Sequence, residues 1–296
     1  MNDMKKASYS KKHRTLVFSA GGAHTTSYIG FWQYVFDEQG YHPDYIIGTS
    51  GGALFGCFMA AGLSSQDMRT SLEIYKPWKF FEIAPFKWMI DFWLHWGLLR
   101  IGKIQKLLDD ILRHYHIDWD SFQETEFQCV ITDLSDGIRK YIPQDMELSL
   151  STAVAASIAI PGIFEPVWVD GDDGRRHCLV DGGVCEGYPV KAALLKGRDQ
   201  SKILTISPFD LTQKRNYEFS RKMQYGRMLY RTLLDAKGED MIDLLDSSYG
   251  DFYLPTGFVS EHVIDFDEQT IDKNIKIGYE NTLKAKQHVD NFFRND

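Results

Sequence analysis

The sequence predicts an α/β protein with a central, mostly parallel sheet. Two short apolar runs, at 15–19 and 45–47, lead into glycine-rich turns, and a segment with helical spacing of apolar residues follows each. A strand, helix, strand, helix order favours parallel strands joined by right-handed crossovers. The chain has 296 residues, of which 44% are hydrophobic, and is long enough to bury a substantial core.

We expect a single domain over residues 15–296, because no Ser-, Gln- or Pro-rich tract and no internal repeat divides the chain. Residues 1–14 form a basic tail that contains Lys5, Lys6, Lys11, Lys12 and Arg14. These charges lack an apolar partner that would anchor them on an anionic membrane. We therefore expect the tail to be disordered.

The overall composition excludes some functions. A formal net charge of −8 does not supply the basic face that a general nucleic-acid binder needs. The apolar run at 16–18 is too short for a signal peptide, and the four cysteines lack metal-ligand spacing. We expect a cytoplasmic protein with reduced thiols, no metal or other cofactor, and peripheral contact with a membrane.

The remaining elements follow from the same periodicities. Helices are predicted at 27–38, 52–61, 102–115, 151–160 and 272–293, and strands at 127–132, 138–142, 167–169, 177–180 and 202–206. Residues 170–174 have the composition of a hairpin turn, and their spacing does not match a calcium loop. A basic stretch at 214–231 is predicted to be a helix with a solvated face.

Residues 76–100 are unusually aromatic. They include Trp78, Phe80, Phe81, Phe86, Trp88, Phe92, Trp93 and Trp96. Lys87, Asp91 and His95 interrupt the apolar run, which excludes a transmembrane helix, and their spacing of four predicts a narrow polar stripe on a helix. We expect a lid or a membrane-facing segment here, although an ordinary buried helix with a wet edge fits the pattern equally well.

The strand at 45–47 ends in Gly48-Thr49-Ser50-Gly51-Gly52, a Gly-x-Ser-x-Gly pattern. In a nucleophile elbow, a sharp turn between strand and helix holds the serine in a strained conformation, so its neighbours must be small. Gly48, Gly51 and Gly52 meet that demand. A glycine-rich loop without a catalytic role produces the same short pattern, so other segments must decide.

The turn after the first strand contains Gly21, Gly22 and Ala23. We expect it beside Ser50, because the carboxyl ends of parallel strands share one edge of a sheet. Its backbone N–H groups, at the start of a helix, are suited to stabilise an oxyanion formed when Ser50 attacks an ester. A tight structural turn would have the same composition.

A candidate base follows a later strand, at Asp181-Gly182-Gly183. An ordinary aspartate is a weak base, so this role requires burial to raise the pKa of Asp181. An aspartate that only caps the next turn would fit the same sequence.

These segments together resemble the patatin-like phospholipases over residues 16–190. The resemblance is carried by the glycine-rich segment at 16–23, the elbow at 48–52, the Asp-Gly-Gly motif at 181–183, and supporting segments at 132–134, 156–164 and 189–190. It implies a three-layer α/β/α fold and a dyad in which Ser50 is the nucleophile and Asp181 the proton acceptor. It also implies metal-free hydrolysis of acyl esters in phospholipids or lysophospholipids, of phospholipase A or lysophospholipase type.

Two residues depart from the family pattern, which usually has three glycines followed by Arg or Lys. Here Ala20 replaces the first glycine and His24 the basic residue. Gly21 and Gly22 keep the backbone donors, but a fixed positive charge is lost unless His24 is protonated. The departures therefore bear on rate and headgroup preference.

Two other functions fit parts of the sequence. An α/β-hydrolase esterase would combine Ser50 with an aspartate and either His262 or His288, although its elbow usually follows several strands. A lipid-binding protein that has lost catalysis would explain Ala20 and His24, and would contact vesicles through Trp88, Trp93 and Trp96.

Overall fold

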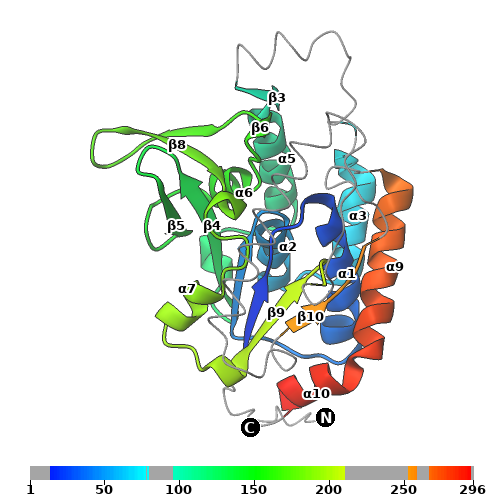
Figure 1. Cartoon of the computed structure of the whole chain (residues 1–296). Helices are drawn as coiled ribbons and strands as arrows, with labels where there is room; N and C mark the ends of the chain where they lie inside the picture. Colours follow the sequence, from blue (N-terminus) through cyan, green and yellow to red (C-terminus); the bar gives the residue numbers. More distant parts are fainter. Residues whose placement is uncertain (1–13, 78, 80–95, 211–252, 259–266, 295–296) are drawn as a thin grey trace, which may run out of the picture.

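The fold is described by a computed structural model, which covers residues 14–77, 79, 96–210, 253–258 and 267–294. These residues form a mixed sheet with helices on both faces, the predicted three-layer α/β/α arrangement (Figure 1). Along the sheet the strand order is β10-β9-β1-β2-β4-β8-β7, and β5 pairs with β4 beside this path.

Parallel pairing dominates one side of the sheet. The parallel strands are β10 (Tyr253–Pro255), β9 (Ile203–Ser207), β1 (Thr15–Phe18), β2 (Tyr45–Thr49) and β4 (Glu126–Asp133). Antiparallel pairs join β5 (Ile138–Ile142), β8 (Arg176–Asp181) and β7 (Val167–Asp170) to the other side. A separate two-stranded sheet contains β3 (Gly97–Leu99) and β6 (Gly162–Phe164).

The long strand β4 brings the ends of β2 and β8 together. Thr49, at the end of β2, pairs with Val130, and Asp181, at the end of β8, pairs with Ile131. Because β5 occupies the other edge of β4 along these residues, β2 and β8 follow one another along a single edge. Since β2 is parallel and β8 antiparallel to β4, their carboxyl ends point at each other.

The helices cover the two faces unequally. They are α1 (Ser27–Trp32), α2 (Gly51–Ala60), α3 (Ser65–Tyr75), α5 (Ile101–His114), α6 (Leu150–Ser157), α7 (Val190–Leu195), α9 (Glu268–Lys284) and α10 (Lys286–Arg294). The π-helix η2 (Gln33–Glu38) continues α1, and short 3-10 helices are η1 (Gly22–Thr26), η4 (Trp119–Ser121), η5 (Gly182–Val184) and η6 (Gln200–Lys202). Leu16 and Phe18 face the larger core with α1, α2 and α5, whereas Val17 and Ile47 face a smaller core with α7.

Most predicted elements are confirmed, with two differences in helix continuity. The single closing helix predicted at 272–293 is wrong, because α9 ends where Ala285 has a ψ of 11°, outside the helical range, and α10 follows. The alanine-rich helix stops at Ser157 rather than at 160. The carbonyl of Ala159 has left the helix and accepts the N–H of Asp181 at 2.9 Å.

Several sequence predictions concern segments that lie partly or wholly outside the described residues. Arg14, assigned to the tail, belongs to the fold, because it is buried and its N–H donates to Asp44 Oδ2 at 2.7 Å. The basic helix predicted at 214–231 lies outside the described residues, as does most of the aromatic segment at 76–100. At the described end of that segment, Gly97–Leu99 is a strand rather than part of a helix.

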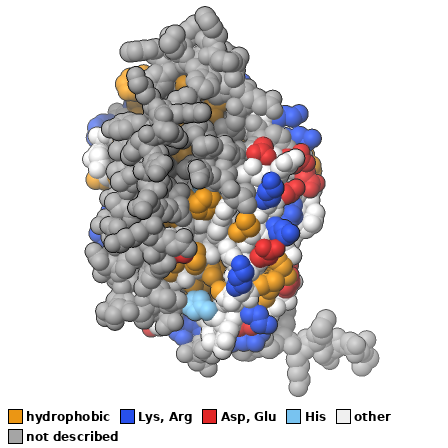
Figure 2. Space-filling view, turned by 45° about the vertical axis from the view of Figure 1, so that its right-hand side comes forward, with side chains coloured by type: hydrophobic (Ala, Val, Ile, Leu, Met, Phe, Trp, Pro, Cys, Tyr) orange, Lys and Arg blue, Asp and Glu red, His pale blue; other side chains and the backbone are white. Residues whose placement is uncertain are grey.

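No helix in the described part of the chain is long and apolar enough to span a membrane. On the side of the molecule that carries α3 and α9, acidic and basic side chains alternate over the surface (Figure 2). Such alternation is typical of solvated helix faces.

Candidate active site

Ser50 lies in the sharp turn between β2 and α2. Its backbone has φ 58° and ψ −127°, a strained combination for a residue with a side chain. A Cβ atom on Gly48, Gly51 or Gly52 would lie only 2.2, 2.1 or 2.4 Å from a neighbouring atom, so the turn requires glycine at these positions. This is the geometry of a nucleophile elbow.

A buried hydroxyl holds the strained turn in place. The N–H of Ser50 donates to Ser157 Oγ at 2.9 Å, and this hydroxyl donates to the carbonyl of Val130 at 2.7 Å. The neighbouring hydroxyl of Thr49 donates to the carbonyl of Glu186 at 2.9 Å, which ties the elbow to the turn after Asp181. Ser157 therefore holds the backbone of Ser50 in position without contacting its hydroxyl.

Asp181 faces the serine across the junction of β2 and β8. Ser50 Oγ donates to Asp181 Oδ2 at 2.6 Å, and the N–H of Gly183 donates to Oδ1 at 2.7 Å. Both members of the pair are buried. A Cβ atom on Gly182 would lie 2.3 Å from the carbonyl oxygen of Val130, so glycine must follow Asp181. Asp181 thus caps η5 and contacts Ser50 at once.

Burial raises the pKa of Asp181 to about 7, although the hydrogen bonds from Ser50 and Gly183 act in the opposite direction. A carboxylate with a pKa near neutrality is a much stronger base than an ordinary aspartate. Burial of Asp181 therefore gives the raised pKa that a carboxylate needs in order to act as a proton acceptor.

The turn after β1 lies next to Ser50. Its helix η1 begins at Gly22, which has a φ of 55°, and the first N–H groups of a helix have no partner within it. Gly22 and Ala23 line the same cavity as Ser50. Gly21 does not line it, because this residue packs against Pro208, whose Cγ would lie 2.6 Å from an added Cβ.

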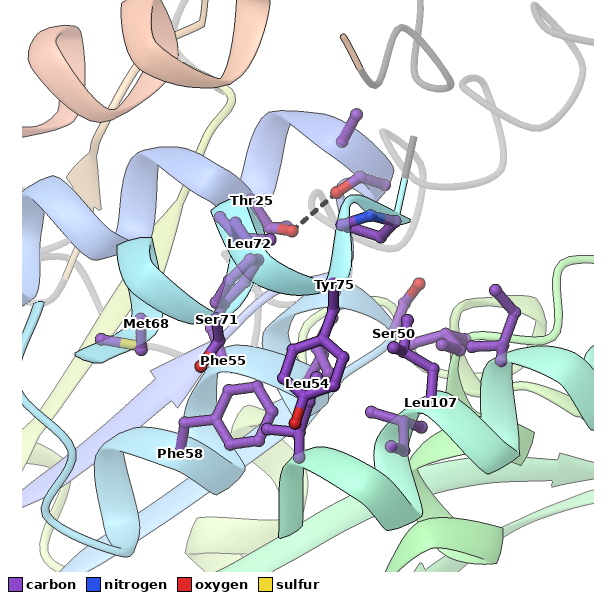
Figure 3. A pocket seen from close by; sticks show the side chains of 18 of the residues that line it. Thr25, Ser50, Leu54, Phe55, Phe58, Met68, Ser71, Leu72, Tyr75 and Leu107 are labelled. Atoms are coloured by element: carbon purple, nitrogen blue, oxygen red, sulfur yellow. Dashed lines mark hydrogen bonds between the residues drawn. The ribbon is translucent and has the colours of Figure 1, made fainter. Parts of the chain in front are cut away.

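An apolar cavity of about 120 Å³ has Ser50 at one end (Figure 3). Leu54 and Phe58 lie one and two turns beyond Ser50 on α2, so the cavity extends for about 12 Å along that helix. Side chains from α2, α3 and α5 form its walls, among them Phe55, Met68, Leu72, Tyr75, Ile104, Leu107, Leu108 and Ile111. The shape and lining suit an alkyl chain whose carbonyl group lies at Ser50.

A family model described as patatin-like phospholipase matches residues 16–194, more than half of the chain. The chain belongs to the patatin-like phospholipase family. The match includes Ser50, Asp181 and the glycine-rich turns around them. Family membership supports a lipid hydrolase in general terms.

Two curated relatives of this patatin-like chain carry names that describe them as uncharacterized proteins. YqhO of Bacillus subtilis is 27% identical over 190 residues, which cover 59% of this chain and 64% of the relative. The NTE family protein Rv1063c of Mycobacterium tuberculosis is 31% identical over 183 residues, which cover 59% and 44%. The chain thus spans less than two thirds of the length of either. A solved structure, VipD from Legionella pneumophila, aligns with 94% of this chain and 67% of its own, at 15% identity and a TM-score of 0.49.

The two residues that depart from the patatin-like pattern are buried and do not line the cavity. His24 is buried, its ring stacks on Phe258 with 4.3 Å between ring centres, and Phe209 meets it edge-on. Ala20 is also buried, and its N–H donates to the carbonyl of Gly187 at 2.8 Å. Neither Ala20 nor His24 is among the described residues that line the cavity.

The histidines of the alternative triad are not placed beside Ser50 in the described residues. His288 lies on α10, whose Phe293 stacks on Tyr41 near the amino end of β2. Ser50 follows the carboxyl end of β2, so His288 lies at the opposite end of the sheet (Figure 1). His262 lies outside the described residues. The described geometry favours the dyad.

Asp133, Asp136 and His177 are the described residues whose side chains lie close enough to share a metal ion. Lys140 Nζ lies 3.6 Å from Asp133 Oδ2 and 3.2 Å from Asp136 Oδ2, so the chain supplies a cation of its own. This cluster includes the start of β8, whereas Ser50 lies at its end. It therefore does not contribute to the dyad.

Sequence reasoning missed Ser157 and the cavity walls. Ser157 lies in the segment 156–164, which resembles the family, but its partners Ser50 and Val130 are distant in sequence. The helical periodicity of α5 marked Ile104 and Leu108 as buried, and both line the cavity. Periodicity does not show whether a buried side chain faces a core or an open cavity.

Proposed function

We propose that this chain is a serine lipid acyl hydrolase that cleaves acyl esters of phospholipids or lysophospholipids. The observation that carries the proposal is the 2.6 Å hydrogen bond from Ser50 Oγ to Asp181 Oδ2, buried at the end of an apolar cavity. Membership of the patatin-like phospholipase family supports the same class of reaction.

In the first step, Ser50 Oγ attacks the carbonyl carbon of the ester, and Asp181 Oδ2 takes the hydroxyl proton. The carbonyl oxygen becomes an oxyanion, which the N–H groups of Gly22 and Ala23 stabilise. The bond to the alcohol oxygen then breaks, and Asp181 returns the proton to the departing alcohol. An acyl ester remains on Ser50.

In the second step, water attacks the acyl carbon and Asp181 takes its proton. The bond to Ser50 Oγ breaks, the serine recovers the proton, and the fatty acid leaves. Asp181 thus accepts and returns a proton in each half of the reaction. A pKa of about 7 suits both roles, because proton transfer is most efficient when the pKa lies near the working pH.

The cavity supports a lipid rather than a small polar ester as substrate. Its walls are almost entirely apolar, and the hydroxyl groups of Thr25 and Ser71 that border it donate to backbone carbonyls, Gly22 at 2.6 Å and Asp67 at 2.9 Å. The polar headgroup would lie outside the cavity. This arrangement supports cleavage of phospholipase A or lysophospholipase type.

The test is fatty-acid release from micelles of phosphatidylcholine and of lysophosphatidylcholine. We expect Ser50→Ala to lower the rate by roughly a thousandfold or more, because it removes the nucleophile. Ser201→Ala is the matched control, since Ser201 is exposed and lies at the amino end of β9, at the opposite end of the sheet. Equal release by wild type and Ser50→Ala would contradict the proposal.

A catalytically inactive lipid-binding protein gives a different result. The wild type would then bind vesicles and release no fatty acid from either lipid. Ala20 and His24, the two residues that favour this alternative, are not among the described residues that line the cavity with Ser50, and this supports catalysis.

A further inference from the structure

A surface groove lies beside the apolar cavity that contains Ser50, which we call the acyl cavity. The groove has a volume of about 530 Å³, and its described lining includes Trp96, Ile101, Gln105, Glu165, Trp168 and Arg176. Trp96 directly precedes β3 and Glu165 directly follows β6, and the other four lie in the first turns of α5, in β7 and at the start of β8. Figure 1 places β3, β6 and the start of α5 at the end of the molecule toward which β9 points, and β2 runs in the same direction as β9.

Two tryptophans at the groove are exposed to an extent that is unusual for this residue. Trp96 is 70% exposed and Trp168 is 45% exposed. Trp96 also has a φ of 62°, a strained conformation for a bulky side chain. A large apolar ring that is strained and exposed adds little packing to the fold, which indicates a role outside it.

The groove also presents a cation. The guanidinium of Arg176 lies 4.9 Å from the ring centre of Trp168, and no carboxylate among the described residues lies within ion-pair distance of it, not even that of its cross-strand neighbour Asp170. Glu165, which also lines the groove, has Arg100 as an ion-pair partner at 3.5 Å. Exposed indole rings beside an arginine match the interface of a phospholipid layer, where tryptophan lies at headgroup depth and cations meet lipid phosphates.

The groove and the acyl cavity share a wall. Phe164 lines the cavity and the next residue, Glu165, lines the groove. On α5, Ile104 lines the cavity and Ile101, one turn earlier, lines the groove. A lipid surface bound at the groove would therefore lie against the wall of the cavity.

We propose that the groove between Trp96 and Trp168 docks the protein on a phospholipid surface. Both indole rings enter the headgroup layer, and Arg176 contacts lipid phosphates. The inference rests on the proposed function, because it brings the lipid next to the cavity that takes the acyl chain.

Binding is measured by co-sedimentation with vesicles of equal parts phosphatidylcholine and phosphatidylglycerol. The full chain with Ser50→Ala is the parent, so that binding is read without hydrolysis. We expect Trp96→Ala and Trp168→Ala each to weaken binding about tenfold, the effect of withdrawing part of one large apolar side chain from the lipid. Arg176→Glu should weaken it to a similar extent, and most strongly at low salt.

Leu195→Ala is the matched control, because Leu195 is 68% exposed on α7, away from the groove. Thermal unfolding checks that each variant is folded. Vesicle binding by both tryptophan variants equal to that of the parent would overturn the proposal. Absence of vesicle binding by the parent, or an equal loss with Leu195→Ala, would overturn it as well.

A second measurement, with Ser50 intact, separates docking from catalysis. The tryptophan variants should hydrolyse a short-chain, water-soluble ester at the wild-type rate and phospholipid vesicles about tenfold more slowly, the ratio expected from weaker docking. Equal losses on both substrates would contradict docking. If the wild type hydrolyses neither substrate, the proposed function fails, and vesicle binding by the parent still decides the docking proposal.

Discussion

Strand β8 carries a buried ionisable residue at each end, and the two ends stabilise charge to very different degrees. At its start, His177 lies between the carboxylates of Asp133 and Asp173. At its end, Asp181 faces two neutral donors, the hydroxyl of Ser50 and the N–H of Gly183. On this one strand, opposite charges therefore stabilise the charged form of His177, whereas no opposite charge among these partners stabilises the charged form of Asp181.

The start of β8 is a cluster of opposite charges. His177 Nδ1 lies 2.6 Å from Asp133 Oδ2, and Nε2 lies 3.1 Å from Asp173 Oδ1, so a protonated ring can donate to both. The hydrogen bond with Asp133, followed by that with Asp173, raises the pKa of His177 above its ordinary value. Arg175 pairs with Asp173 at 2.7 Å and completes the cluster.

The end of β8 has no such compensation among the described residues. Burial dominates the environment of Asp181 and makes its ionised form unfavourable. Opposite charges therefore stabilise this strand at one end, whereas at the other end burial disfavours the ionised carboxylate, as the proposed role of Asp181 as a base requires.

The largest contrast should appear in activity. Asp181→Asn removes the proton acceptor, and we expect fatty-acid release to fall by roughly a thousandfold or more. Asp173→Asn, which removes a carboxylate from the cluster at the other end of β8, should retain most of the activity per folded molecule. A similar loss in both variants, measured as kcat/KM on the same micelles, would remove the distinction between the two ends.

The same substitution, Asp181→Asn, should increase the stability of the fold although it lowers activity. The pKa of Asp181 rises from 3.8 to about 7 on folding, so the folded state binds more protons between these values and loses stability as the pH increases through them. Asp181→Asn escapes this loss and should be more stable than wild type by about 4 kcal/mol near pH 8, the free energy of that pKa difference. The advantage should vanish toward about pH 4 in urea denaturation. A variant less stable than wild type at both pH values would show that Asp181 is structural.

Removal of a carboxylate from the charge cluster at the start of β8 should lower the stability of the fold. Asp133→Ala leaves His177 and Lys140 without a buried carboxylate and should destabilise the fold by about 3 kcal/mol. Because folding raises the pKa of His177, its contribution is present below its unfolded pKa and is lost as the pH rises through the folded value. The destabilisation should therefore shrink as the pH rises above about 6.5. Asp172→Asn, an exposed carboxylate in the same hairpin turn, is the control.

Of the expected effects, the change in kcat/KM with pH is the smallest. Asp181 must be ionised to accept a proton, so kcat/KM should fall about tenfold for each pH unit below about 7. A rate measured on a water-soluble ester avoids changes in the lipid surface. A profile that stays flat down to about pH 5 would mean that the base has the pKa of an ordinary aspartate.

The sequence contained most of the local structure of the site. A Gly-x-Ser-x-Gly pattern after an apolar run and Asp-Gly-Gly after another located Ser50 and Asp181, because such turns allow few residue types. The strand and helix order also predicted the parallel half of the sheet. These features depend on residues that are close together in the chain, so a single sequence is enough to predict them.

The features that could not be predicted depend on residues far apart in the chain. Antiparallel pairing of β8 with β4 brings Asp181 to Ser50, and hairpin composition alone does not specify that register. The sequence predicts backbone N–H donors at Gly21, Gly22 and Ala23 alike, but it does not show that Pro208 lies against Gly21 and that Gly22 and Ala23 are the two that line the cavity. The break at Ala285 within the predicted closing helix had no proline or glycine to mark it.

The most direct test of the dyad is covalent labelling with a fluorophosphonate probe, followed by intact-protein and peptide mass spectrometry. We expect one adduct, on Ser50, that forms faster as the pH rises through about 7 and is absent in Ser50→Ala. Asp181→Asn should form it roughly a thousandfold more slowly at every pH. Rapid labelling of Asp181→Asn, or labelling at another residue in Ser50→Ala at the wild-type rate, would contradict the assignment of Ser50 and Asp181 as nucleophile and base.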